Sequence, residues 1–274
     1  DIRTADCTLD PKSLERQITP RTRLVAAGYA SNAVGTINDV ARVVELAHRA
    51  GALAFIDAVH YAPHGPVDVA ALDCDFLACS PYKFFAPHLG VIYGKRAHLD
   101  RLTPYKVRPA LNEGWDRWET GTQNHEALAG LVAAIGYLED LGLRVRPGSG
   151  GRRSLLLSAM EAIQGYEREL IGRLIAGLLA IPGLQFYGIT DPAQFHRRTP
   201  TVSIRMANRT PQQLAQRLGE EGIFVWDGNF YALGLTERLG VEADGGLLRI
   251  GLVHYNTGDE VDRLLGELRK AAAQ

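Results

Sequence analysis

Residues 55–84 read FIDAVHYAPHGPVDVAALDCDFLACSPYKF. Two short apolar runs, Leu53–Ile56 and Phe76–Cys79, have the length and the flanking polarity of buried parallel strands. Asp57 follows the first run, and the segment 80–83 (SPYK) follows the second. Ligands of open α/β sheets bind outside the carboxyl ends of the strands. The stretch therefore predicts a carboxylate and an amine at the edge of the sheet where a ligand would bind.

This pair of groups is the one that a pyridoxal phosphate (PLP) enzyme requires. An Asp can keep the ring nitrogen of the cofactor protonated, and a Lys can join the cofactor as a Schiff base. Lys83 lies between SPY and FFAPHLG, and apolar surroundings lower the pKa of a lysine and make it a better nucleophile. A lone Lys after a strand is usually a surface residue, and Asp57 alone could equally be a turn residue. The interpretation depends on the two together.

Composition limits the classes of function. The 274 residues are 46% hydrophobic and 22% charged, as in an ordinary globular protein. The net charge of −1 provides no basic field for nucleic acid or for anionic lipid. The first ten residues contain no apolar signal segment, and no run approaches the roughly 18 residues that span a membrane. Three cysteines without metal spacing, Cys7, Cys74 and Cys79, indicate reduced thiols of a cytoplasmic protein.

The expected elements divide the chain into two domains. Strands 23–29, 53–56 and 76–79 alternate with helices, Asn38 caps the first of these helices, and strand 89–93 returns antiparallel. Residues 146–152 (RPGSGGR) are the expected linker. A long helix over 153–180 follows, then strands 184–187, 201–206, 223–226 and 247–252, with capping boxes at 210–213 and 257–260. We expect a large domain over 1–146 and a smaller α+β domain over 147–274.

Further side chains could complete a site. His60 and Asn32 lie in loops near the same strand ends, and Ser80 and Thr122 carry hydroxyls that could bind a phosphate. Arg249 lies inside an apolar strand, LLRIGLVHYN, and so requires an anionic partner. That partner could be a structural carboxylate or the carboxylate of a substrate.

Five stretches together resemble class V aminotransferases of PLP fold type I, in particular the cysteine-desulfurase-like branch. They are SNAVGTIND (31–39), FIDAVHYAPH (55–64), CSPYKFFAPHLGVIYG (79–94), ETGTQN (119–124) and LLRIGLVHYNTGDEVDRLL (247–265). The resemblance runs from about residue 21 to the C-terminus. It implies part of a large domain, with a mostly parallel sheet and helices on both faces, followed by a smaller α+β domain.

The resemblance also implies a role for each candidate residue. The roles are contact with the cofactor for Asn32, the pyridine-nitrogen partner for Asp57, a place near the phenolic oxygen for His60, phosphate contacts for Ser80 and Thr122, the Schiff-base amine for Lys83, and the substrate carboxylate for Arg249. In the family the Thr reaches the phosphate of the neighbouring subunit, which implies a homodimer.

The chain departs from the family in three places. Tyr82 stands where the family has a phosphate-contacting His; a phenol can still donate a hydrogen bond to the phosphate. Tyr231 falls about where desulfurases carry their nucleophilic Cys, and residues 224–240 contain no Cys. The N-terminal part of the family, which supplies a phosphate-cradling turn and a residue stacked on the ring, is absent, so we expect a large C-terminal portion. A persulfide cannot form on a phenol, so we expect that this is not a true desulfurase.

The sequence therefore predicts a PLP-dependent transferase or lyase that acts on a small amino acid. Transamination, lyase chemistry and epimerisation all stay open. A catalytically silent protein of the same fold, with a regulatory or scaffold role, is the alternative. A NAD(P)-dependent enzyme is disfavoured because YASNAVGTIN is not the Gly-rich turn that such a site needs.

Overall fold

The computed structural model describes residues 1–148 and 150–273. Residue 149 of the expected linker 146–152 lies outside the described residues. The chain forms two compact units. The parallel-sheet unit comprises residues 18–29 and 39–159, and the antiparallel-sheet unit comprises residues 1–17, 30–38 and 160 onward. The expected domain division after residue 146 stays a prediction.

The parallel-sheet unit is built around four strands in the order β1-β2-β3-β4. Its elements are β1 (Leu24–Gly28), α2 (Val40–Arg49), β2 (Leu53–Asp57), α3 (Val69–Leu72), β3 (Phe76–Cys79), η1 (Pro81–Phe84), β4 (Val91–Gly94), α4 (Arg96–Arg101), η2 (Trp115–Trp118), α5 (His125–Val145) and the start of α6 (Arg152–Leu179). The first three strands run parallel, and β4 pairs with β3 in the antiparallel sense. This topology confirms the expected class of fold.

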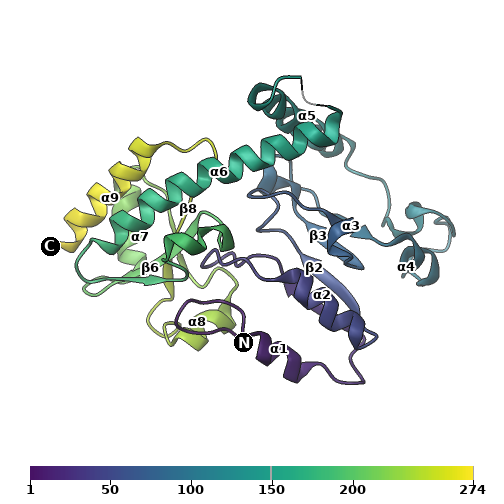
Figure 1. Cartoon of the computed structure of the whole chain (residues 1–274), viewed down its shortest axis with the longest axis horizontal. Helices are drawn as coiled ribbons and strands as arrows, with labels where there is room; N and C mark the ends of the chain where they lie inside the picture. Colours follow the sequence, from purple (N-terminus) through teal and green to yellow (C-terminus); the bar gives the residue numbers. More distant parts are fainter. Residues whose placement is uncertain (149, 274) are drawn as a thin grey trace. The chain divides into compact units, whose positions relative to one another are not determined.

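Helix α2 lies against β1 and β2 (Figure 1). Its buried side chains recur at helical spacing, and they include Val40, Val43 and Ala47. The expected cap, Asn38, is wrong. Asp39 caps the helix instead, because its carboxylate accepts a hydrogen bond from the Arg42 amide at 3.0 Å.

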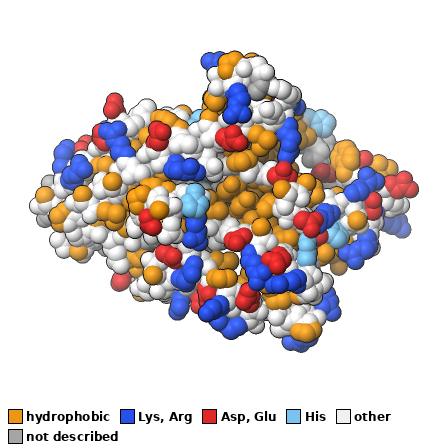
Figure 2. All heavy atoms as spheres, in the orientation of Figure 1, with side chains coloured by type: hydrophobic (Ala, Val, Ile, Leu, Met, Phe, Trp, Pro, Cys, Tyr) orange, Lys and Arg blue, Asp and Glu red, His pale blue; other side chains and the backbone are white. Residues whose placement is uncertain are grey.

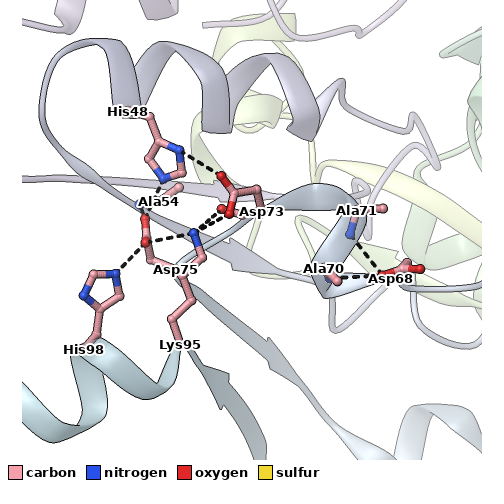
Figure 3. Close-up of polar contacts among 9 residues, drawn as sticks. All are labelled: His48, Ala54, Asp68, Ala70, Ala71, Asp73, Asp75, Lys95 and His98. Atoms are coloured by element: carbon pink, nitrogen blue, oxygen red, sulfur yellow. Dashed lines mark hydrogen bonds and ion pairs between the residues drawn. The ribbon is translucent and has the colours of Figure 1, made fainter.

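A polar cluster around Asp75 lies where β2 and β3 begin (Figure 3). Asp75 is 3% exposed and precedes β3 directly. Its carboxylate accepts hydrogen bonds from the Ala54 amide at 2.8 Å and lies 2.8 Å and 2.6 Å from Nε2 of His48 and His98. Lys95 Nζ is 3.4 Å away. Since His48 belongs to α2, Ala54 to β2 and His98 to α4, one carboxylate fixes the positions of three elements relative to β3.

The antiparallel-sheet unit has the strand order β5-β6-β8-β7. Its elements are α1 (Pro11–Gln17), the remainder of α6, β5 (Leu184–Tyr187), η3 (Pro192–Arg197), β6 (Thr201–Met206), α7 (Pro211–Glu220), β7 (Trp226–Gly228), α8 (Leu233–Leu239), β8 (Leu247–Gly251) and α9 (Gly258–Ala272). All its strand pairs are antiparallel. Both expected capping boxes are confirmed, at Thr210 with Gln213 and at Thr257 with Glu260.

The two faces of this sheet pack differently. One face carries the main core, to which α6, α7 and α9 contribute buried leucines and isoleucines (Figure 1). The other face carries a smaller cluster that includes Val34, Phe230 and Leu247. The expected strand 223–226 is displaced, since β7 begins at Trp226. Ile223 and Val225 pack against the main core without pairing in the sheet, and this alternation produced the strand-like pattern.

The surface is mixed in charge. Lys and Arg side chains lie among Asp and Glu side chains over the face drawn in Figure 2, in keeping with the net charge of −1. Within residues 1–148 and 150–273, no helix is both long enough and apolar enough to cross a membrane.

Candidate active site

The carboxyl ends of β2 and β3 place Asp57 at the edge of the parallel sheet. Asp57 is the last residue of β2 and lies opposite Ala78 of β3. The pairing continues one residue further, because the Ala58 amide donates to the Ala78 carbonyl at 2.8 Å. The exposed Asp57 carboxylate accepts a hydrogen bond from the Val59 amide at 2.9 Å and makes no ion pair with any described residue. A negative charge without a cation thus stands at the end of the strand.

Lys83 lies in the short 3₁₀ helix η1, which follows the neighbouring strand β3. The Lys83 amide donates to the Ser80 carbonyl at 2.9 Å, and Phe85 closes the turn in a left-handed conformation with φ of 74°. The Lys83 side chain is half-buried, with Nζ 5.8 Å from the ring centre of Tyr82. Tyr82 in turn stacks on His88, with the ring centres 4.7 Å apart. Strand end and turn together fix where the lysine backbone leaves the sheet.

Ser80 precedes this turn in extended conformation. Its hydroxyl caps none of the amides of η1 and makes no hydrogen bond to another described side chain or backbone group. A serine in the position before a helix usually accepts a hydrogen bond from a backbone amide of the first turn, and Ser80 does not. The Ser80 hydroxyl therefore has its hydrogen-bonding capacity left for a ligand.

His60 lies in the segment that leaves β2. Its ring is half-buried and meets the ring of His64 edge to face, with 5.5 Å between the centres. The next residue, Tyr61, stacks on Tyr29 at 3.8 Å, and Tyr29 follows β1 directly. This aromatic pair ties the segment that bears His60 to the end of the first strand.

Thr122 precedes α5 and is exposed. Asn124 caps that helix by accepting from the Ala127 amide at 3.0 Å. The contacts of the described residues do not join Thr122 to Asp57 or Lys83. Its expected role toward a phosphate stays a prediction.

Arg249 and Asn32 meet in the antiparallel-sheet unit. Arg249 of β8 donates through Nη1 to the Asn32 carbonyl at 3.0 Å, and Asn32 Nδ2 donates to the Phe230 carbonyl at 2.8 Å. The guanidinium also lies over the Phe230 ring, 4.5 Å from its centre. Burial lowers the pKa of Arg249, and no described carboxylate pairs with it. A half-buried cation without a counter-ion is an anion-binding group.

Gly35 is required for the loop that bears Asn32. Its φ is +76°, and a Cβ at this position would lie 2.3 Å from the Thr201 carbonyl oxygen. The Thr199 amide donates to the Gly35 carbonyl at 2.8 Å, and the Ser203 hydroxyl donates to the Ala33 carbonyl at 2.6 Å. The loop is therefore held directly against β6 and the residues before it.

Tyr231 lies between β7 and α8, with φ of 63° and a fully exposed side chain. The Tyr231 amide donates to Oδ1 of Asn229 at 3.1 Å. The three cysteines lie elsewhere: Cys7 and Cys74 are buried and Cys79 is half-buried. Burial raises the pKa of Cys7 to about 11, which keeps that thiol protonated and unreactive.

Comparison with known proteins identifies the family. Residues 3–146 and 154–264 match the Aminotransferase class-V family. A cysteine desulfurase of Cronobacter sakazakii is 32% identical over 277 residues, which cover 96% of this chain and 62% of that protein. The aminotransferase-like protein FGM3 of Gibberella zeae is 32% identical over 263 residues, covering 94% of this chain and 61% of its own.

Solved structures agree. The apo cysteine desulfurase of Thermococcus onnurineus NA1 matches with a TM-score of 0.82 at 27% identity, covering 99% of this chain and 65% of that one. The fold is that of the PLP fold type I enzymes, as expected from the sequence. The chain belongs to the class V aminotransferase family, which consists of PLP-dependent transferases and lyases. It spans 62% of the length of the Cronobacter desulfurase and 39% of a cysteine desulfurase of Synechococcus elongatus.

The side chains of the parallel-sheet unit fit this cofactor. Asp57 offers an unpaired carboxylate to a protonated pyridine nitrogen, Ser80 an unused hydroxyl to a phosphate, and Lys83 an amine to the aldehyde. Their roles toward the cofactor stay predictions. Trp226 and Phe230 were not among the predicted site residues, but Trp226 lies opposite Arg249 in the sheet and the Phe230 ring lies beside its guanidinium.

Proposed function

We propose that this chain is the larger part of a PLP-dependent enzyme that acts on an α-amino acid, with Lys83 as the residue that carries the cofactor. One observation supports this more than any other. An unpaired carboxylate, Asp57, and an amine, Lys83, lie at the carboxyl ends of two neighbouring parallel strands of a fold shared with PLP enzymes. PLP, when bound, supplies an electron sink for the bonds at the substrate α-carbon.

The side chains of the parallel-sheet unit divide the work of holding the cofactor. Asp57 holds a proton on the ring nitrogen, because a carboxylate stabilises the charged pyridinium. Ser80 and Tyr82 donate hydrogen bonds to the phosphate, and His60 donates to the phenolic oxygen. With the cofactor bound, the Lys83 amine would move the proton at the substrate α-carbon as a general base and acid.

In the antiparallel-sheet unit, Arg249 binds the substrate carboxylate. The support is electrostatic, since the guanidinium is half-buried and has no counter-ion among the described residues. Asn32 holds the guanidinium through its carbonyl and so sets its direction. We also expect Asn32 to contact the cofactor.

The reaction is proposed to differ from cysteine desulfuration by a persulfide on the enzyme. The relatives named above are called cysteine desulfurases, and these names alone favour that reaction. Residues 224–240, however, hold no thiol, and the exposed side chain in this loop is a phenol, that of Tyr231. With L-cysteine as substrate, the protein should form no persulfide detectable by mass spectrometry. A persulfide on Cys7, Cys74 or Cys79, with sulfide released on reduction, would overturn this part of the proposal.

The assembly follows from the proposed role of Thr122. A phosphate contact from the neighbouring subunit requires a homodimer. We expect this homodimer in the cytoplasm, with an amino acid as its small-molecule substrate. The mixed surface charge gives no support to a nucleic-acid partner (Figure 2).

An absorption spectrum tests the proposed function. The full-length protein incubated with PLP should gain the visible band of the lysine-bound cofactor, and Lys83→Ala should lack it. Lys12→Ala, on the exposed side of α1, is the matched control and should keep the band. A band retained in Lys83→Ala would refute the role of this lysine. A wild-type protein that binds PLP but changes no amino acid would favour the silent alternative.

A further inference from the structure

Three side chains form a row across the antiparallel sheet. Arg249 of β8 lies opposite Ser203 of β6 on one side and opposite Trp226 of β7 on the other. Side chains directly opposite each other in antiparallel strands project from the same face, with Cβ atoms roughly 5 Å apart. The side chains of Trp226 and Arg249 therefore leave neighbouring positions on one face of the sheet.

The two sides of the row differ in how they are covered. On one side Ser203 is fully buried, because its hydroxyl donates to the Ala33 carbonyl and the 30–38 loop lies over it. On the other side β7 is the edge strand of the sheet, and Trp226 is 66% exposed. Within this unit, the side of the row toward Trp226 is therefore more exposed than the side toward Ser203.

Two further aromatic side chains lie near Arg249 and Trp226. The Phe230 ring lies 4.5 Å from the guanidinium, and Phe224, two residues before Trp226, is 90% exposed. The other guanidinium on this face, Arg205, donates to the backbone carbonyls of Asp244 and Gly246. An apolar group of a ligand placed beside Trp226 would bury both its own surface and that of the indole.

We propose that Trp226 determines specificity: it contacts the side chain of the substrate whose carboxylate binds Arg249, and so selects amino acids with aromatic or large apolar side chains. This inference rests on the proposed function in that Arg249 receives the carboxylate. It adds a class of substrate that differs from the cysteine in the names of the relatives.

Binding of carboxylates without an amino group tests this inference separately from the chemistry at Lys83. Propanoate, succinate and 3-phenylpropanoate cannot react with the cofactor, so calorimetric titration of the full-length protein, with and without PLP, reports the Arg249 site alone. We expect 3-phenylpropanoate to bind at least about tenfold more tightly than either other acid, a difference typical of one aromatic contact. Lys83→Ala should bind all three like the wild type.

Three variants assign the preference to its residue. Trp226→Ala should remove the preference for 3-phenylpropanoate, Trp226→Phe should keep most of it, and Trp118→Phe, a half-exposed tryptophan in the parallel-sheet unit, should leave it unchanged. Unchanged circular dichroism shows that Trp226→Ala is folded. An unchanged binding ratio in Trp226→Ala, a preference for succinate, or no binding of any acid overturns the inference. Loss of the visible PLP band would instead contradict the proposed function and leave the binding ratio intact.

Discussion

Replacing Asp75 by asparagine should lower the free energy of unfolding by about 2 kcal/mol at neutral pH. Burial alone would raise the pKa of Asp75, but the Ala54 amide, the His48 and His98 rings and the charge of Lys95 together lower it from 3.8 to about 2 (Figure 3). Each pKa unit corresponds to roughly 1.4 kcal/mol, so this shift means that the surroundings stabilise the ionised carboxylate by about 2 kcal/mol relative to a neutral group of the same shape. Asparagine is such a group.

The dependence on pH has a defined sign. The pKa of Asp75 is lower in the folded state than in the unfolded state, so its contribution is fully present above about pH 4 and is lost as the pH falls toward 2. The difference in stability between wild type and Asp75→Asn should therefore shrink over that interval. Urea unfolding followed by circular dichroism at pH 7 and at pH 3 measures it.

Asp73→Asn is the matched control. Asp73 pairs with the same Lys95 at 2.6 Å, but its side chain is 67% exposed, and asparagine tolerates its left-handed φ of 54°. Exposed ion pairs contribute little, so we expect a change below about 0.5 kcal/mol. Equal effects of the two substitutions, or an Asp75→Asn deficit that is the same at both pH values, would refute the reasoning.

Two further predictions concern the antiparallel-sheet unit. Arg249→Ala should raise the substrate KM on the order of 100-fold while the PLP content stays at the wild-type level, because truncating a charged partner costs about 2–5 kcal/mol; equal loss of PLP, measured by absorbance after denaturation, would show that the role is wrong. Gly35→Ala should destabilise the fold by about 2 kcal/mol or more, since its Cβ would lie 2.3 Å from the Thr201 oxygen at a φ of +76°. Gly51→Ala, at φ of +70° with open space around it, separates the strain of the backbone from the clash.

The sequence predicts the parallel sheet well because its signals are local. The apolar runs at 53–56 and 76–79 correspond to β2 and β3, and the quick return at 89–93 corresponds to the antiparallel β4. The capping boxes at Thr210 and Thr257 are local as well. Asn38 and Asp39 are adjacent candidates for one cap, and only the first turn of the helix shows which side chain reaches the Arg42 amide.

The surroundings of Arg249 depend on contacts that are remote in the chain. Asn32, which holds the guanidinium, is 217 residues away, and the 30–38 loop reaches β6 only because Gly35 allows a close approach. The register that places Trp226 opposite Arg249 depends on the residue at which β7 begins. The alternating apolar residues Ile223 and Val225 predict a strand that begins earlier, because they pack against the main core without pairing in the sheet. Helix α8 was not expected, although Gly240 ends it with a left-handed φ of 72°.

The central claim is that Lys83 holds the cofactor beside the Asp57 carboxylate. Reduction of the PLP-loaded, full-length protein with borohydride, followed by proteolysis and mass spectrometry, locates the modified residue directly. We expect a phosphopyridoxyl group on Lys83, with labelling lowered in Asp57→Ala. Labelling of a different lysine, or labelling of Lys83 that is indifferent to Asp57, would contradict it.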